Sequence, residues 1–449
     1  MAKALEIRSA ERDAELEAIV TQALEEALSA GATSAEAAAS RGAGLSVTAR
    51  MGEVETIEHH RDKEIAVTVY VGNRTGSASS SDYSQAAVRD TVRAACSIAR
   101  YTAEDDCTGL AEVGDLAREI PALALYHPWD LPAEQAIEIA RACEAAALAE
   151  DRRIVNSEGA TVNVHAGVEC YGNTHGFLAC VAGTRHGLSC SVLGEEDGAM
   201  QRDYWFTAAR DARLLEEAAQ VGRTAARRTL RRLGARRIAT RRAPVLFEAP
   251  VAGSLLSHFV SAVRGSSLYR KASFLLDKLG EPVFAPLVRI HEQPHLKGAL
   301  GSAPFDDDGV ATHTRDLVTG GVLKGYVLDA YSARKLKLPN TGNSGGVHNL
   351  TLEPGDADFA ALLKRMDTGL LVTELIGFGV NSVTGDYSRG AAGFWVEGGE
   401  IRYPVEEITI AGNLKDIYRN IAAVGNDVDT RGNIRSGSIL IGAMTIAGS

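Results

Sequence analysis

The sequence has few cysteines and no long hydrophobic run. No stretch approaches the roughly 18 apolar residues of a membrane-spanning helix, and the charged N-terminus lacks the apolar core of a signal peptide. The six cysteines all lie in the first half of the 449 residues: Cys96, Cys107, Cys143, Cys170, Cys180 and Cys190. We therefore expect a cytoplasmic protein that does not bind membranes, with cysteines that are free thiols packed like small hydrophobic side chains.

An excess of positive charge is also lacking. The chain has 58 acidic residues against 47 lysines and arginines, a net charge of −11 at pH 7, which argues against a nucleic-acid partner. One segment, 223–242, nevertheless holds nine arginines in twenty residues. It has no aromatic residues for stacking on bases, so we interpret it as a solvated helix end followed by an interdomain linker.

The N-terminal half repeats one pattern, in which segments of alternating polarity lie between two helices. The first unit begins with a helix at residues 10–30, and the second ends with a helix from Asp211 to Leu233. Alternation with a period of two predicts strands. We expect residues 1–235 to form a duplicated α/β domain, with two α-β-α units that share a sheet and helices that flank it.

The C-terminal half is richer in strands. A helix is expected at 251–265, where apolar residues recur along one face. Gly320-Gly321 and Gly398-Gly399 lie between alternating runs and are predicted to be two-residue hairpin turns. We expect residues 243–449 to form a β-rich domain with a curved or barrel-like mixed sheet, so that the fold class is α+β.

A short match to a zinc motif occurs at HEQPH, residues 291–295. In H-E-x-x-H peptidases both histidines lie on one face of a helix. Pro294 would remove a helix donor, and it pushes the preceding residue out of the helical region. We therefore interpret the segment as a short strand that runs into a turn, with His291 and His295 as loop histidines.

A second metal candidate is the stretch from His165 to Cys190, where His165, His175 and His186 each precede a cysteine by four or five residues. Zinc could take imidazole and thiolate ligands. The tight C-x₂₋₄-C spacing of structural zinc sites is absent, and residues on successive strands would lie in different rows. We interpret these residues as part of the core, with an independent metallohydrolase built on them as an alternative hypothesis.

Two loops combine glycine with polar residues. The segment GNSGG at 342–346 matches the nucleophile elbow G-x-S-x-G, but a strand rather than a helix is expected after it. Its residues Gly342, Asn343, Gly345 and Gly346 are instead predicted to shape a turn or to allow close approach of a peptide backbone. His348 either lines that approach or is a surface histidine. The segment FDDDG at 305–309 lacks calcium-loop spacing and is predicted to be an acidic turn.

Four phrases of the C-terminal half carry a family resemblance: LYRKASFLLDKLG, GSAPFDDDGV, YSARKLKLPNTGNSGGVHNL and SRGAAGFWVEGGEIRYPVEEITIAGNL. They resemble the TldD/PmbA family, specifically its PmbA (TldE) branch. NTHGF and TRHGLS extend the similarity into the N-terminal half. The resemblance implies a dimer that encloses a groove, with an N-terminal α/β domain and a β-rich C-terminal domain. It also implies links to DNA gyrase, after which the family is named.

In the TldD branch the resemblance implies zinc on an H-E-x-x-x-H helix, completed by a cysteine near the C-terminus. The corresponding histidine places hold Ser257 and Ala262 here, the glutamate place holds His258, and the cysteine place falls near Arg431. A catalytic zinc needs three protein ligands and an open position. We therefore expect no metal, no cofactor and no catalytic residue in this chain, and zinc in a TldD-type partner.

The favoured hypothesis is a non-catalytic PmbA/TldE-type subunit of a TldD–TldE zinc metalloprotease that processes or degrades small or unfolded peptides. Its partners would be a TldD-type subunit in a heterodimer and peptide substrates, which would bind by strand-edge pairing. The alternative is a stand-alone homodimeric peptide-binding or scaffold protein without peptidase activity. A TldD homologue in the same genome would favour the first hypothesis.

Overall fold

The N-terminal half consists of two copies of a unit in which three strands lie between two helices. The computed structural model describes residues 10–448. The first copy comprises α1 (Ala10–Ser29), β1 (Ser34–Arg50), β2 (Glu53–Val71), β3 (Arg74–Ser80) and α2 (Gln85–Tyr101). The second comprises α3 (Ala133–Leu148), β4 (Ile154–Asn173), β5 (Leu178–Glu196), β6 (Ala199–Ala209) and α4 (Ala218–Leu230). The predicted duplication and shared sheet are confirmed.

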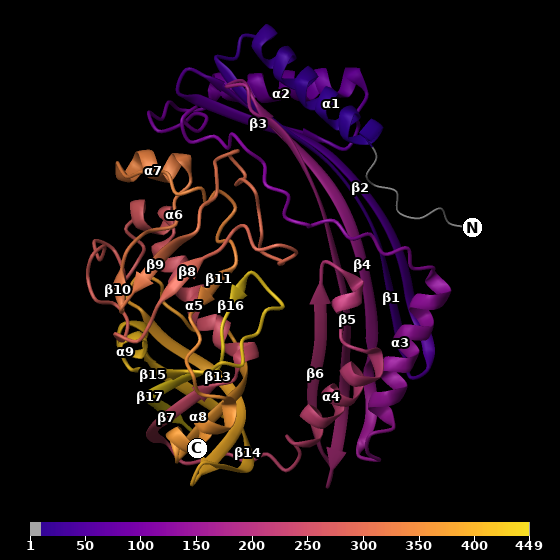
Figure 1. Ribbon diagram of the computed structural model, residues 1–449, viewed down its shortest axis with the longest axis vertical. Helices are drawn as coiled ribbons and strands as arrows, with labels where there is room; N and C mark the ends of the chain where they lie inside the picture. The colour runs from indigo at the N-terminus through magenta and orange to yellow at the C-terminus, as the bar shows by residue number, and fades with distance from the viewer. Residues whose placement is uncertain (1–9, 449) are drawn as a thin grey trace.

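The six strands form one antiparallel sheet in the order β3-β2-β1-β4-β5-β6. Alternate residues of β1, such as Ala35, Ala37 and Ala39, are buried in a cluster with side chains of α1 and α2. Alanine at these positions lets the helices approach the sheet closely. The opposite face of the sheet curves around the C-terminal half (Figure 1), so residues such as Glu36 point toward that half.

The helix predicted from Asp211 to Leu233 was placed too early. The structure has a short 3₁₀ turn at Ala212–Leu214, and α4 begins only at Ala218. The carboxylate of Asp211 accepts a hydrogen bond from the backbone N–H of Arg213, and the backbone N–H of Glu216 donates to the Thr207 hydroxyl at 3.1 Å. These side-chain bonds compete with helical hydrogen bonds in this segment.

The prediction that all the cysteines are free was wrong for two of them. Cys170 on β4 and Cys180 on β5 face each other directly in the antiparallel register and form a disulfide. Directly opposed residues are the closest cross-strand neighbours, and the Cα atoms of this pair are 3.9 Å apart. The other four cysteines are free: Cys96, Cys107, Cys143 and Cys190.

The C-terminal half contains two sheets and confirms the expected barrel-like architecture. One sheet has the order β14-β13-β12-β7-β17-β15, and an additional β14–β17 pairing closes five of these strands into a ring. The strands are β7 (Arg241–Phe247), β12 (Gly369–Ile376), β13 (Asp386–Glu397), β14 (Glu400–Asn413), β15 (Ile421–Val424) and β17 (Ile439–Ala447). The hairpin predicted at Gly398-Gly399 joins β13 to β14, and both glycines have positive φ.

The second sheet has the order β10-β9-β8-β11-β16. Its strands are β8 (Ile290–Glu292), β9 (Arg315–Thr319), β10 (Val322–Leu323), β11 (Leu350–Leu352) and β16 (Ile434–Arg435). Gly320 and Gly321 form the predicted turn between β9 and β10. The helices of this half are α5 (Ala249–Val263), α6 (Gly265–Tyr269), α7 (Ala330–Leu336), α8 (Phe359–Met366) and α9 (Leu414–Arg419).

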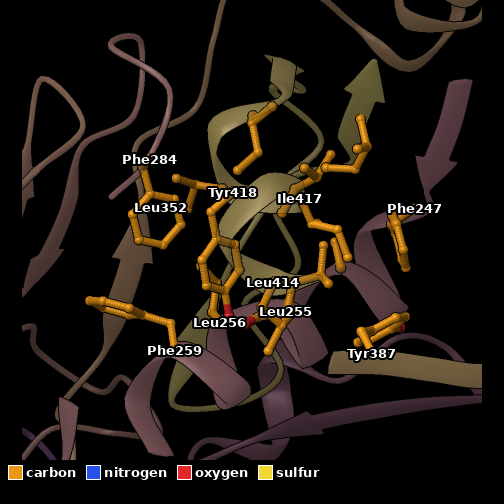
Figure 2. Packing of buried hydrophobic residues seen from close by; sticks show 14 of the residues in the cluster. Phe247, Leu255, Leu256, Phe259, Phe284, Leu352, Tyr387, Leu414, Ile417 and Tyr418 are labelled. Carbon is orange, nitrogen blue, oxygen red and sulfur yellow. Dashed lines mark hydrogen bonds between the residues drawn. The ribbon is translucent and has the colours of Figure 1, made fainter. Parts of the chain in front are cut away.

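The main core of this half lies around α5 (Figure 2). The apolar face predicted for the helix is buried, with Leu255 and Phe259 almost inaccessible to solvent. Tyr418 of α9 stacks on Phe284 at a centroid distance of 4.4 Å, and its hydroxyl donates to the carbonyl of Leu255 at 2.9 Å. Within residues 10–448, no helix has the length and apolar character required to cross a bilayer.

Candidate functional site

The helix α5 carries three of the four positions that the family resemblance assigns to the zinc motif. Ser257 is exposed, and its hydroxyl donates to the carbonyl of Gly253 one turn earlier at 3.1 Å. Ala262 is completely buried in the core on another face of the helix. His258 lies between these environments and is partly buried. The three positions therefore do not present three donor atoms to a common point.

His258 lies beside two residues of β13. Its ring packs edge-on against Tyr387, with the centroids 5.9 Å apart. Burial, followed by the nearby charge of Arg389, lowers the pKa of His258, so the imidazole is neutral at physiological pH. Its Nε2 atom and the buried hydroxyl of Tyr387 have no hydrogen-bond partner within the described chain.

Arg431, which the resemblance places near the family cysteine, connects the two halves of the molecule. Its guanidinium binds the Asp429 carboxylate through two hydrogen bonds of 2.9 and 2.7 Å and donates to the carbonyl of Phe206 on β6 at 2.8 Å. It also lies 4.1 Å from the ring centroid of Trp205. Although burial opposes the shift, the hydrogen bonds from Arg431 keep the pKa of Asp429 below its usual value.

The donor set at these positions does not fit zinc. A serine, an alanine and an arginine replace the two imidazoles and the thiolate, and a guanidinium is a permanent cation. Among residues 10–448, no group of three or more His, Cys, Asp or Glu side chains is arranged to hold a metal ion. These positions are therefore occupied by a polar helix face and by an arginine that pairs with Asp429 in its own loop and bonds Phe206 of the other half.

Two cavities flank Arg431. One has a volume of about 280 Å³ and is lined by side chains of β6, α5, β12 and β13, and the other, of about 380 Å³, lies beside the loop that contains Asp429. The arginine-rich segment borders the smaller cavity through Arg228. The guanidinium of Arg228 forms ion pairs with Asp203 at 3.4 Å and with Glu248 at 3.0 Å. Arg232 is buried as well, so this part of the segment is an interdomain clamp rather than the expected solvated helix end.

The predicted groove residues belong to a loop organised by a buried hydrogen-bond network. The amide of Asn343 donates to Glu292 at 3.0 Å and to the carbonyl of Gly346 at 2.8 Å, and its oxygen accepts from Arg315 at 2.6 Å. Arg315 also binds Glu292 at 2.8 Å. The network fixes the conformation of the loop, whose Gly342, Gly345 and Gly346 all have positive φ.

The glycines of this loop differ in what surrounds them. Gly342 borders a cavity of about 630 Å³ that also involves His295. A Cβ on Gly345 would lie 2.4 Å from the carboxylate of Asp307, so this exposed glycine permits the close approach of the two loops at the surface. Gly346 has open space where a Cβ would be. Burial lowers the pKa of His348, whose backbone N–H donates to Glu292 at 2.9 Å.

The segment HEQPH is a strand that runs into a turn, as the sequence predicts. His291 lies on β8 and pairs with Thr351 of β11, while His295 lies beyond the strand, 3.0 Å from the Thr312 hydroxyl. Glu292 between them is almost fully buried and binds the Asn343 loop. This role of Glu292 was not predicted. The signal available was a glutamate close after the apolar residues Leu287, Val288 and Ile290 in an expected strand.

The histidines and cysteines of residues 165–190 do not converge. His165 stacks on His60 at 5.8 Å on the concave face of the sheet. His186 is buried on the opposite face against Trp129. His175 lies in the β4–β5 turn, where its Nδ1 is 3.0 Å from the carbonyl of Ala111. The core interpretation therefore holds for His186, Cys170 and Cys190 but is wrong for His165 and His175, which are exposed. Among residues 10–448, these side chains form no cluster that could hold a metal for the metallohydrolase alternative.

The acidic segment 305–309 forms the predicted turn, and Asp306 within it is buried while Asp307 is exposed. Asp306 accepts hydrogen bonds from the backbone N–H groups of Val310 and Ser344, both at 2.9 Å. Burial and the charge of Asp308 outweigh these bonds and raise the pKa of Asp306 to about 7. Burial also raises the pKa of Glu36 on β1, and the charge of Asp308 adds to this shift. No local pattern in the sequence indicates this burial.

Comparison with solved structures identifies the fold. A candidate modulator of DNA gyrase from Bacteroides thetaiotaomicron matches with a TM-score of 0.93 and 27% identity, over 98% of this chain and 100% of that one. Another, from Thermotoga maritima, matches with a TM-score of 0.86 and 26% identity, over 96% and 100%. TldE from Thermococcus kodakarensis, at 19% identity and a TM-score of 0.81, shows likeness of fold alone. The chain therefore has the two-part α/β architecture of these proteins.

Sequence comparison identifies the family. Three PmbA/TldA metallopeptidase profiles match: domain 1 over residues 35–99, the central domain over 126–233 and the C-terminal domain over 240–448. Metalloprotease PmbA of Escherichia coli O157:H7 is 51% identical over 96% of both chains. A Metalloprotease PmbA homolog of Haemophilus influenzae is 47% identical over 98% of this chain and 97% of its own, whereas a TldD homolog of that organism is 25% identical over 84% and 82%. The chain belongs to the PmbA/TldD metallopeptidase family and is more similar to these PmbA proteins than to that TldD homolog.

Proposed function

We propose that this chain is the non-catalytic, PmbA/TldE-type subunit of a zinc metallopeptidase that processes or degrades small or unfolded peptides. A TldD-type partner would contribute the zinc. The observation that carries the proposal is the side-chain chemistry at the motif positions. Ser257, Ala262 and Arg431 cannot supply the imidazole and thiolate ligands of a catalytic zinc.

The edge of β2 supports association with a partner. β1 pairs with the whole of β2, but β3 pairs only with its residues Ile65–Val71. Residues 53–64 therefore form a sheet edge of the described chain, and most of their side chains are exposed, including Ile57 at 46%. A long exposed edge has unpaired backbone groups that can accept a strand from another chain. We assign this edge to subunit association.

Peptide capture is the second part of the proposal. The cavities beside β6 and the Asn343 loop lie along the cleft between the two halves. The edge strand β6 offers main-chain groups to an extended peptide, and the open space beside Gly346 leaves room for the peptide backbone. Main-chain hydrogen bonds give affinity without strong sequence preference, which suits an enzyme that acts on unfolded peptides.

The test uses the purified chain, a TldD-type subunit from the same organism, and their mixture. We expect the chain alone to hold no stoichiometric zinc by elemental analysis and to cleave no unfolded peptide, whereas the mixture cleaves it and a chelator stops cleavage. Ser257→Ala in this chain should alter the kcat/KM of the mixture by less than about twofold, because Ser257 would hold no metal.

Chelator-sensitive cleavage by the chain alone would refute the proposal. If the chain forms a stable homodimer, ignores the TldD-type subunit and still binds peptides, the stand-alone scaffold is the better description. A motif histidine of the partner can also be substituted. If this inactivates the mixture while Ser257→Ala does not, catalysis is located in the partner.

A further inference from the structure

The smaller interdomain cavity, of about 280 Å³, combines apolar walls with arginines. It lies where β6, the strand at the sheet edge facing the C-terminal half (Figure 1), meets α5 and β13. Its apolar lining includes Trp205, Phe206, Val251 and Leu375, and its cationic lining consists of Arg228, Arg389 and Arg431. The volume lies just below the usual range for ligand pockets and suits a small group or the end of a chain.

Two of the three arginines are neutralised by the protein itself. Arg228 binds Asp203 and Glu248, and Arg431 binds Asp429 at 2.7 Å. The charges of these two guanidinium groups are therefore already paired. They contribute to the shape of the cavity more than to its net charge.

Arg389 of β13 differs from both. Glu374, the other carboxylate that lines the cavity besides Asp203, pairs instead with Arg232 at 2.5 Å. Within residues 10–448, Arg389 takes part in no ion pair, and its buried Nε atom has no hydrogen-bond partner. A partly buried guanidinium without a counter-ion is unfavourable unless water or a bound anion satisfies it.

Further polar groups near Arg389 also lack partners. The buried Thr373 hydroxyl lines the cavity and makes no hydrogen bond within the described chain. Tyr387 lies two residues before Arg389, hence on the same face of β13, and its buried hydroxyl is equally unpaired. His258 lies one turn after the cavity-lining Ser254, and its free Nε2 is on a neutral ring. Unpartnered buried groups of this kind are rare in proteins.

We propose that this cavity binds a carboxylate, namely the C-terminal carboxylate of an extended peptide, through the guanidinium of Arg389. The planar fork of arginine matches a carboxylate with two parallel hydrogen bonds. One unpaired positive charge suits a monoanion better than a phosphate dianion. Trp205 and Leu375 would receive the terminal side chain. That the ligand is a peptide rests on the proposed function, whereas recognition of the anion rests on Arg389 alone.

The experiment measures binding of two dipeptides to the full chain by calorimetry at low salt. One is N-acetyl-alanyl-phenylalanine with a free carboxylate, and the other is its C-terminal amide. We expect the acid to bind at least about tenfold more tightly than the amide, as one charge-assisted bidentate contact allows. Arg389→Gln should remove this preference, and Arg389→Lys should retain part of it.

Arg365→Gln is the matched control, because Arg365 is an exposed arginine on α8 outside the cavity, and the acid should bind this variant as it binds the wild type. Equal binding of acid and amide by the wild type, no binding of either, or an unchanged preference in Arg389→Gln would each overturn the inference. If Arg389→Gln does not fold, the wild-type comparison and Arg389→Lys decide. The test uses no partner and no cleavage, so its outcome is separate from that of the proposed function.

Discussion

Single buried side chains set the chemistry at the junction of the two halves. Asp306 is 2% exposed and its pKa is raised to about 7 by burial and by Asp308. In the unfolded chain the same carboxyl titrates near 3.8. The folded state therefore binds a proton more strongly than the unfolded state does. The stability that this stronger proton binding adds to the folded state is fully present below about pH 4. It is lost as the pH rises toward 7.

Asp306→Asn removes this titration. The variant should be less stable than the wild type at pH 5, because the Asn amide cannot accept the hydrogen bonds that both Asp oxygens receive. The deficit should shrink or reverse by pH 8, since each unit of pKa shift corresponds to about 1.4 kcal/mol. Urea unfolding across this range checks the prediction. A stability difference that does not change with pH would contradict it.

At the same scale, the family resemblance assigned Ser257, His258 and Arg431 to the places of a zinc motif, and this assignment stays a prediction. The surroundings of these residues could not be predicted at all. That Arg431 would reach Phe206, 225 residues away, could not be predicted. Long-range partners depend on how the sheet curves, and local pattern does not contain this information.

At the scale of elements, close helix packing depends on small residues. α3 and α4 lie side by side on the sheet, and a Cβ added to Gly222 of α4 would lie 1.9 Å from the carbonyl oxygen of Cys143 on α3. This carbonyl oxygen belongs to the backbone of α3, which cannot move aside as a flexible side chain can. Gly253 of α5 is also helical, but a Cβ there would meet only Ile434 at an ordinary 3.7 Å.

These two glycines give a matched pair of substitutions. Gly222→Ala should lower the free energy of unfolding by about 2 kcal/mol or more, because α4 must move away from α3. Gly253→Ala should be neutral or stabilise by up to about 1 kcal/mol, since alanine is the better helix former. Thermal or urea unfolding of both variants checks the prediction. Equal changes in the free energy of unfolding of the two variants would show that the close contact between α3 and α4 does not determine the result.

The elements also show which sequence signals are reliable. The alternating segments and the duplication were predicted from period alone, and the apolar face of α5 from helical spacing. The start of α4 was not predicted correctly. The Asp211 carboxylate and the Glu216 backbone N–H bond to neighbouring groups instead of extending the helix. The pairing of Cys170 with Cys180 needed the strand register. The predicted division between residues 235 and 243 stays a prediction.

At the scale of the whole molecule, hydrogen bonds from arginine side chains connect the N-terminal half to the C-terminal half at separate places. Arg431 reaches β6 near one end of the cleft. Elsewhere, Arg334 of α7 donates to the carbonyls of Cys107 and Gly109, at 3.1 and 2.9 Å, and also to that of Leu110. The cleft that holds the proposed peptide site is therefore bounded by fixed contacts rather than by a single hinge.

Arg334→Ala tests whether these anchors hold the halves in place. The substitution leaves three carbonyls of the segment 107–110 without their donor, which should cost about 1–3 kcal/mol and loosen that segment. Hydrogen exchange should rise in residues 105–112 while exchange in β4 and β5 stays slow, because the sheet keeps its own ladder. Arg365→Ala, at an exposed position on α8, should change neither quantity. If exchange rises equally across the sheet, the anchor supports the fold as a whole and not the junction alone.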